Sequence, residues 1–163
     1  MGKRQVELRS QYLNFLRFQV VESAASTFTQ AEIDTNLSAE RGVMMEIHSV
    51  ELDLTTLNLF DEVPAAGQEN LRIQVTRETK SSAISLNDSD VIAQFRPEIV
   101  RSAAIGTDAG PLYFFTDKVV RVQFAMPLPY VKPSIFVGIQ GSDAASAHTV
   151  NGRIGYTLRD VRS

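Results

Sequence analysis

The feature that most constrains the fold is an alternation of apolar and polar side chains that recurs along the chain. Its clearest example spans residues 70–79, where Leu71, Ile73 and Val75 are each followed by a polar residue. A period of two with one apolar face is typical of a β-strand that is buried on one side. The same pattern predicts strands at residues 118–126, 134–140 and 150–161. Asn151-Gly152 is also a hairpin-turn sequence, but the alternation runs through it and favours one continuous strand.

The segment at residues 43–54 has the same alternation with one change of phase. Its apolar side chains fall on odd numbers up to Ile47 and on even numbers from Val50 onward. A shift of one residue turns the following side chains to the opposite face of a strand. We therefore expect a β-bulge or a sharp twist near His48 and Ser49.

Residues 12–22 carry apolar side chains that are spread too evenly to define a period. Their aromatic and β-branched content favours a strand with both faces covered, and an amphipathic helix is the alternative. Residues 27–33 are predicted to form another short strand.

One short helix is predicted in a connecting loop. Asn87 or Asp88 would cap its first turn, and Asp88 also suits the positive end of the helix dipole. Phe95 would lie on its apolar face and Pro97 would end it. The proline-rich stretch at residues 126–129 is predicted to be a loop, because proline is not tolerated in a central strand.

Together these segments give seven or eight strands, with long loops near residues 55–69, 80–110 and 141–149. They predict an all-β fold, a two-sheet antiparallel β-sandwich. Uneven loops favour a jelly roll over an immunoglobulin-like sandwich. We expect one domain over residues 12–163, preceded by a basic N-terminal arm over residues 1–11.

Charge and composition exclude several classes of protein. The chain has no cysteine, so disulfides and thiolate metal sites are excluded, and no apolar run is long enough to span a membrane. The net charge is −3, yet residues 1–17 contain four basic residues against one acidic residue, which gives +3. An arm carrying Lys3, Arg4 and Arg9 is a candidate contact for a nucleic acid or a neighbouring subunit, and a solvated terminus is the alternative.

No combination of residues forms a convincing reactive site, and we expect neither catalysis nor a cofactor nor a metal. Glu46 and His48 would share a strand face, but zinc needs a third ligand. Ser142, Asp143 and His148 lie in a loop of small residues without the nucleophile-elbow pattern. A hydrolase or isomerase would need Glu46 and His48 to meet a third group around one cavity.

Two clusters of apolar residues lie beside loop signals. Clustered apolar side chains in loops either pack under a sheet edge or form an interface. The candidate contacts between subunits are Leu57, Leu59, Phe60, Leu112, Tyr113 and Phe114.

The region from residue 27 to residue 161 resembles the small single jelly-roll major capsid proteins of bacterial and archaeal viruses. The segments that carry the resemblance are residues 28–35, 44–52, 71–77, 132–138 and 153–158. The resemblance implies a structural protein that assembles with copies of itself, as trimers or pentamers, and with other capsid proteins into the shell of a virion. It also implies synthesis in the host cytoplasm. The alternative function is a ligand-binding β-sandwich, such as a lectin-like carbohydrate-binding module.

Overall fold

The computed structural model describes residues 10–37, 42–53, 68–101, 113–115, 119–142 and 147–161, and in these ranges the protein is all-β. The strands are β1 (Ser10–Val21), β2 (Thr29–Asp34), β3 (Val43–Asp53), β4 (Gln68–Asn70), β5 (Arg72–Thr76), β6 (Val91–Phe95), β7 (Glu98–Arg101), β8 (Tyr113–Phe115), β9 (Val119–Tyr130), β10 (Ser134–Gln140) and β11 (Thr149–Asp160). The described residues contain no helix long and apolar enough to cross a lipid bilayer.

Two four-stranded antiparallel sheets form the sandwich, as predicted from the alternation. Sheet A has the order β1-β11-β3-β9 and sheet B the order β2-β10-β5-β6. The pairing is nested: β1 pairs with β11, β2 with β10, β3 with β9 and β5 with β6. This is a long hairpin rolled up so that successive strand pairs fall in alternate sheets, which is the jelly roll.

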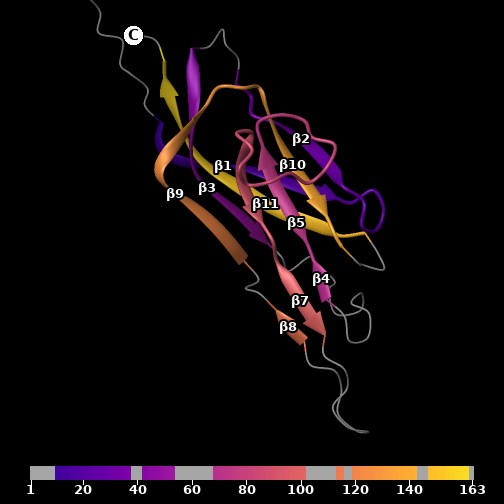
Figure 1. The fold of residues 1–163 in the computed structure, drawn as a ribbon. Coiled ribbons are helices and arrows are strands. Elements are labelled where there is room, and N and C mark those ends of the chain that lie inside the picture. Colours follow the sequence, from indigo (N-terminus) through magenta and orange to yellow (C-terminus); the bar gives the residue numbers. More distant parts are fainter. Residues whose placement is uncertain are drawn as a thin grey trace, which may run out of the picture.

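A third, small sheet with the order β4-β7-β8 continues sheet B at one end of the sandwich (Figure 1). Ile73 pairs with Phe95 in sheet B, and Asn70 pairs with Glu98 in the small sheet. The register does not shift between these two pairs. Strands β4 and β5 therefore form one arm, and β6 and β7 the other arm, of a single extended hairpin that runs from sheet B into the small sheet.

The core lies between sheets A and B. Alternate residues of each strand point inward, and the aliphatic side chains of β3, β5, β10 and β11 fill most of the space. The large side chains with no measurable exposure are Met45, Ile47, Ile73, Ile135, Ile139 and Ile154. Because the strands of sheets A and B each place one apolar face in this layer, the opposite faces of the two sheets are left for other contacts.

Gly152 lies inside β11, which confirms the continuous strand. A Cβ atom at this position would lie 2.3 Å from Cζ of Phe18 and 2.6 Å from the carbonyl oxygen of Glu51. The absence of a side chain therefore lets the Phe18 ring pack across β11 on the core side, where it is 6% exposed.

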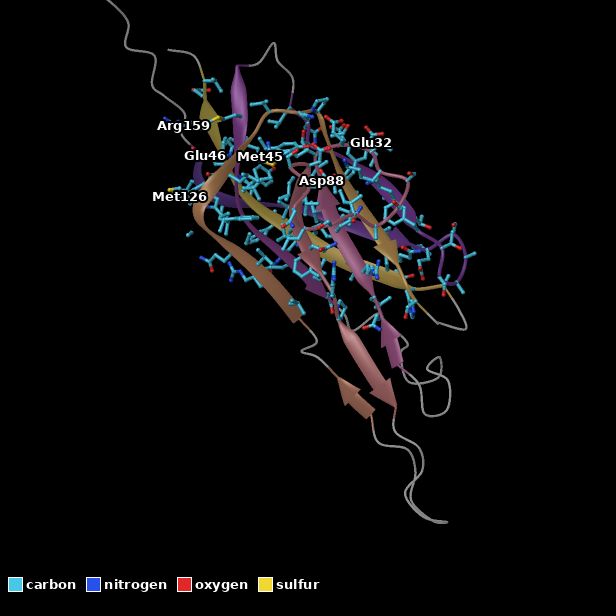
Figure 2. All side chains as sticks on the ribbon, viewed as in Figure 1. Glu32, Met45, Glu46, Asp88, Met126 and Arg159 are labelled. Atoms are coloured by element: carbon cyan, nitrogen blue, oxygen red, sulfur yellow. The ribbon has the colours of Figure 1, made fainter. Side chains whose placement is uncertain are left out.

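The predicted bulge in β3 is present at His48. On β11, the neighbours Gly155 and Tyr156 pair with Ser49 and Ile47, so His48 has no opposite residue. On the other side of β3, the pairing with β9 jumps from Gln123 to Leu128. The β9 segment between these two positions curves away from β3, and Met126 is 80% exposed on this bend (Figure 2).

Three sequence expectations are wrong. The predicted helix after Asn87 is instead a turn followed by strand β6. The proline-rich residues 126–129 belong to β9, where they are tolerated because β9 is an edge strand of sheet A. Residues 12–22 form a strand, but none of the described residues covers its second face, where Leu13 and Phe15 are exposed.

Candidate functional site

Most of the predicted contact residues lie outside the described part of the chain. This holds for Lys3, Arg4 and Arg9 of the arm and for Leu57, Leu59, Phe60 and Leu112 of the loop clusters. Tyr113 and Phe114 lie in β8, whose backbone pairs with β7. These predictions therefore stay predictions, and the described candidates for a functional surface are the outer faces of sheets A and B.

Strand β1 carries exposed apolar side chains, of which Leu13 and Phe15 lie beside Gly155 on the outer face of sheet A, which points away from sheet B. Tyr12 is 81% exposed, Leu13 46% and Phe15 40%. Phe15 pairs with Gly155 in the register, so a small residue lies beside it on the sheet surface. This apolar group extends along the outermost strand of the sheet, because β1 is an edge strand.

Next to this apolar group, a row of charged side chains crosses the same face. The register aligns Arg17 of β1, Arg153 of β11, Glu51 of β3 and Arg121 of β9. The Glu51 carboxylate accepts a hydrogen bond from Nε of Arg153 at 2.6 Å and forms an ion pair with Arg121, whose Nε lies 3.1 Å away. The Arg153 guanidinium lies 4.4 Å from the centre of the Phe15 ring, a cation–π contact that joins the charged row to the apolar group.

Part of the outer face of sheet B is covered by the chain itself. Residues 77–90, which connect β5 to β6, fold back over it and are held by glutamine side chains of neighbouring strands. Gln74 accepts a hydrogen bond from the backbone N–H of Ile84 at 2.9 Å, and Gln94 donates to the carbonyl of Ile84 at 2.8 Å. Gln30 accepts from the backbone N–H of Lys80 at 2.8 Å. Because the three glutamines share one row of the sheet, they form a polar ladder that fixes the returning segment.

The acidic residues at the end of this segment are engaged with Lys80. Its ammonium group lies 2.6 Å from the carboxylate of Asp90 and 3.7 Å from that of Asp88. The hydrogen bond to Asp90 raises the pKa of Lys80. Asp88 also accepts from the backbone N–H of Asp90, which closes the turn before β6. These carboxylates therefore hold the covering segment together.

The candidate reactive groups in β3 do not converge. His48 Nε2 lies 2.9 Å from Oγ1 of Thr157, and Glu46 is paired with Arg159 at 3.2 Å at the end of the sheet (Figure 2). Among the described residues, no group of three or more His, Cys, Asp or Glu side chains is placed to hold a metal ion.

The loop that contains Ser142 and His148 is fixed through a buried carboxylate. Glu22, 3% exposed, accepts from the backbone N–H of Gly141 at 2.7 Å and from that of His148 at 2.9 Å. Ser142 Oγ accepts from the backbone N–H of Asn70. In the described residues, Glu22 thus bridges the two ends of the loop, and Ser142 links it to β4. Asp143, the third member of the proposed combination, lies outside the described residues.

A polar pocket of about 480 Å³ lies where sheet B meets the small sheet. The pocket lies beside the glutamine ladder on the outer face of sheet B, where Arg72 of β5 pairs with Gln140 of β10. Its lining residues are Ser26, Asn70, Leu71, Arg72, Arg96, Gln140, Gly141 and Ser142. Sequence reasoning missed this pocket. The alternation places Arg72 on the polar face of its strand, but only the register brings Arg96 and Gln140 beside it.

Comparison of the sequence with models of known protein families gives no match, and a search of curated proteins finds no relative.

Proposed function

We propose that the chain is a structural subunit that assembles with copies of itself into a shell, as the subunits of viral capsids do. The jelly roll is compatible with this function but is shared by capsid proteins, lectins and cupins. The polar pocket on sheet B is the feature on which a lectin-like role would depend. The choice between these functions therefore depends on the surfaces.

The observation that carries the proposal is the exposed apolar group on β1. A strand at the edge of a sheet presents unpaired backbone N–H and C=O groups, which are ready to pair with another chain. Soluble monomers usually protect such an edge, whereas β1 has twelve residues and exposes Tyr12, Leu13 and Phe15 along it. An edge that offers both backbone hydrogen bonds and apolar side chains is suited to association with a second copy.

The N-terminal arm adds a second part to the proposal. Lys3, Arg4 and Arg9 directly precede β1 in the sequence, so the arm would leave the subunit near the proposed contact. A positive arm at a subunit boundary would contact the genome or a neighbouring subunit inside a virion. Trimers or pentamers, and association with other capsid proteins, belong to the same proposal.

The test is the size of the purified protein. We expect sedimentation velocity to show species that grow with protein concentration, and electron microscopy to show closed particles. The double substitution Tyr12→Ser with Phe15→Ser should leave the protein folded but shift it to the monomer. Leu86→Ser is the matched control, because Leu86 is 63% exposed but lies on the segment that covers sheet B. A wild-type protein that stays monomeric across salt and pH would contradict the proposal, as would equal effects of the two sets of substitutions.

A further inference from the structure

Two arginines face each other in the polar pocket of sheet B. Ile73 pairs with Phe95, and the backbone N–H of Leu71 donates to the carbonyl of Pro97 at 3.0 Å. This register places Arg72 directly opposite Arg96. Like charges at directly opposite positions of an antiparallel pair destabilise the sheet. The fold therefore keeps an unfavourable charge pair at this position.

The charges of the two arginines are not compensated by the residues that the structure describes. Neither guanidinium forms an ion pair with a described carboxylate. Within the described ranges, the Arg96 guanidinium donates a hydrogen bond of 3.3 Å to the amide oxygen of Gln94, a neutral acceptor. Glu22 binds the backbone N–H of Gly141 in the pocket wall, but its carboxylate does not line the pocket. The pocket thus has an excess of positive charge, in a protein whose net charge is −3.

The other lining groups are hydrogen-bonding side chains of neutral residues. Gln140 neighbours Arg72 on β10, Ser26 and Ser142 come from the loops on either side, and Asn70 comes from β4. Ser26 has a φ angle of 56°, an uncommon left-handed conformation for a residue other than glycine. Its carbonyl oxygen lies 3.5 Å from the amide nitrogen of Gln140. Strained backbone of this kind is common at binding sites.

We infer that this pocket binds a small anion that carries hydroxyl groups, of the class of sugar acids and sugar phosphates. Guanidinium groups bind carboxylate and phosphate oxygens through paired hydrogen bonds, and an anion between Arg72 and Arg96 removes their mutual repulsion. Hydroxyl and amide side chains supply partners for the hydroxyl groups of the ligand. None of the described residues that line the pocket is aromatic, so they offer no ring on which a nucleobase could stack, which favours a sugar over a nucleotide. Its volume of about 480 Å³ is in the range of small-molecule sites.

The proposal is tested by titrating the full chain with glucuronate and with glucose 6-phosphate, using NMR to follow the backbone and arginine side-chain N–H signals. Inorganic phosphate and neutral glucose are the reference ligands. We expect at least one of the two anionic sugars to bind with a dissociation constant of about 1 mM or below, and more tightly than either reference. The two titrations also distinguish a carboxylate from a phosphate as the preferred anion.

Arg72→Gln and Arg96→Gln should each weaken this binding about tenfold or more. Without ligand, each substitution should raise the melting temperature, because it removes the repulsion between the two cations. The matched control is Arg159→Gln, an exposed arginine of sheet A, which should leave ligand binding unchanged. Absence of binding by both anionic sugars, or binding that persists in both pocket variants, would overturn the inference. Either result leaves the shell proposal intact, since that depends on β1.

Discussion

The outer faces of the two sheets differ in how far residues of the same chain cover them. The outer face of sheet B is partly covered by residues 77–90, which are fixed to it through the amide groups of Gln30, Gln74 and Gln94. Sheet A is left open, with aromatic side chains on an edge strand and a row of arginines around one glutamate. A face that the chain covers contributes to its own stability, whereas an open apolar face gains most from a partner. The two faces should therefore respond differently to equivalent substitutions.

The largest effect is expected for Gln74→Ala. Gln74 is 1% exposed, and its amide oxygen accepts the backbone N–H of Ile84. Removing the side chain leaves that N–H without its partner and opens a gap under the covering segment, so we expect a loss of about 2–3 kcal/mol in the free energy of unfolding. Urea unfolding would measure the loss, and hydrogen exchange at Ile84 should accelerate.

Gln123→Ala is the matched control on sheet A. Gln123 lies on the open outer face and is exposed, so its removal should change stability by no more than about 0.5 kcal/mol. If the two substitutions lowered the free energy of unfolding equally, the contacts to the segment that covers sheet B would contribute no more to stability than an exposed side chain of sheet A does.

The next effect concerns the glutamate in the arginine row. Glu51→Gln keeps the shape of the side chain but removes the negative charge between Arg121 and Arg153, leaving three cations in the row. The Glu51 side chain is only 10% exposed, so the pairs are partly shielded from water, and we expect a loss of about 1.5–2 kcal/mol. The loss should shrink as salt is added. Glu46→Gln, which breaks a more exposed pair with Arg159, should cost less than about 0.5 kcal/mol.

A third effect lies at the connection between the two sheets. Tyr130 ends β9, is 2% exposed, and donates its hydroxyl to the carbonyl of Ser134 at the start of β10. Burial raises the pKa of Tyr130 to about 12, from about 10 when unfolded. The folded state thus holds the Tyr130 proton more tightly than the unfolded state does. The stability that this difference contributes is complete below pH 10 and is lost as the pH rises toward 12. At pH 11 the loss is about 1.4 kcal/mol.

Tyr130→Phe removes this pH dependence. The variant should be less stable than wild type at neutral pH, by about 1 kcal/mol for the lost hydrogen bond. In urea unfolding experiments the advantage of the wild type should shrink above pH 10 and be reversed by about pH 11, because the loss at that pH exceeds the value of the hydrogen bond. A constant difference over this range would mean that the Tyr130 hydroxyl ionises at the same pH in the folded and unfolded chains.

The elements of this fold could be read from the sequence where the signal is local. The alternation located β3, β5, β9, β10 and β11, and the change of phase located the bulge at His48. The helix after Asn87 was wrongly predicted because an aspartate that accepts a backbone N–H serves a turn as well as a helix cap, and Asp88 does so before β6. Local chemistry alone does not separate these two outcomes.

The surface features were harder to predict because they depend on register and on which faces are covered. Arg72 and Arg96 are far apart in sequence, and nothing in either segment indicates that they are opposite each other. The exposure of Phe15 was missed for a related reason, since an apolar residue in a strand is normally assigned to the core. Both features require the spatial order of strands, which comes from the nested pairing of the whole roll.

The smallest expected difference in stability, about 0.5–1 kcal/mol between two phenylalanine variants, separates the two faces most directly. Phe15 lies beside Gly155 on sheet A, and Phe28 lies over Gly138 on sheet B, where ring atoms come within 2.7 Å of the position a Cβ would take. Phe28 is partly buried and Phe15 is 40% exposed. We expect Phe28→Ser to cost about 1.5 kcal/mol and Phe15→Ser about 0.5–1 kcal/mol, mostly from the lost contact with Arg153.

Stability and association should then move in opposite directions. Phe28→Ser should weaken the fold more but leave the sedimentation of the assembled species unchanged, because its ring is used within the subunit. Phe15→Ser should disturb the fold less and association more. Phe15→Ser could instead cost more stability than Phe28→Ser and leave association unchanged. The Phe15 ring would then stabilise the fold of the monomer, and the outer face of sheet A would not be a contact between subunits.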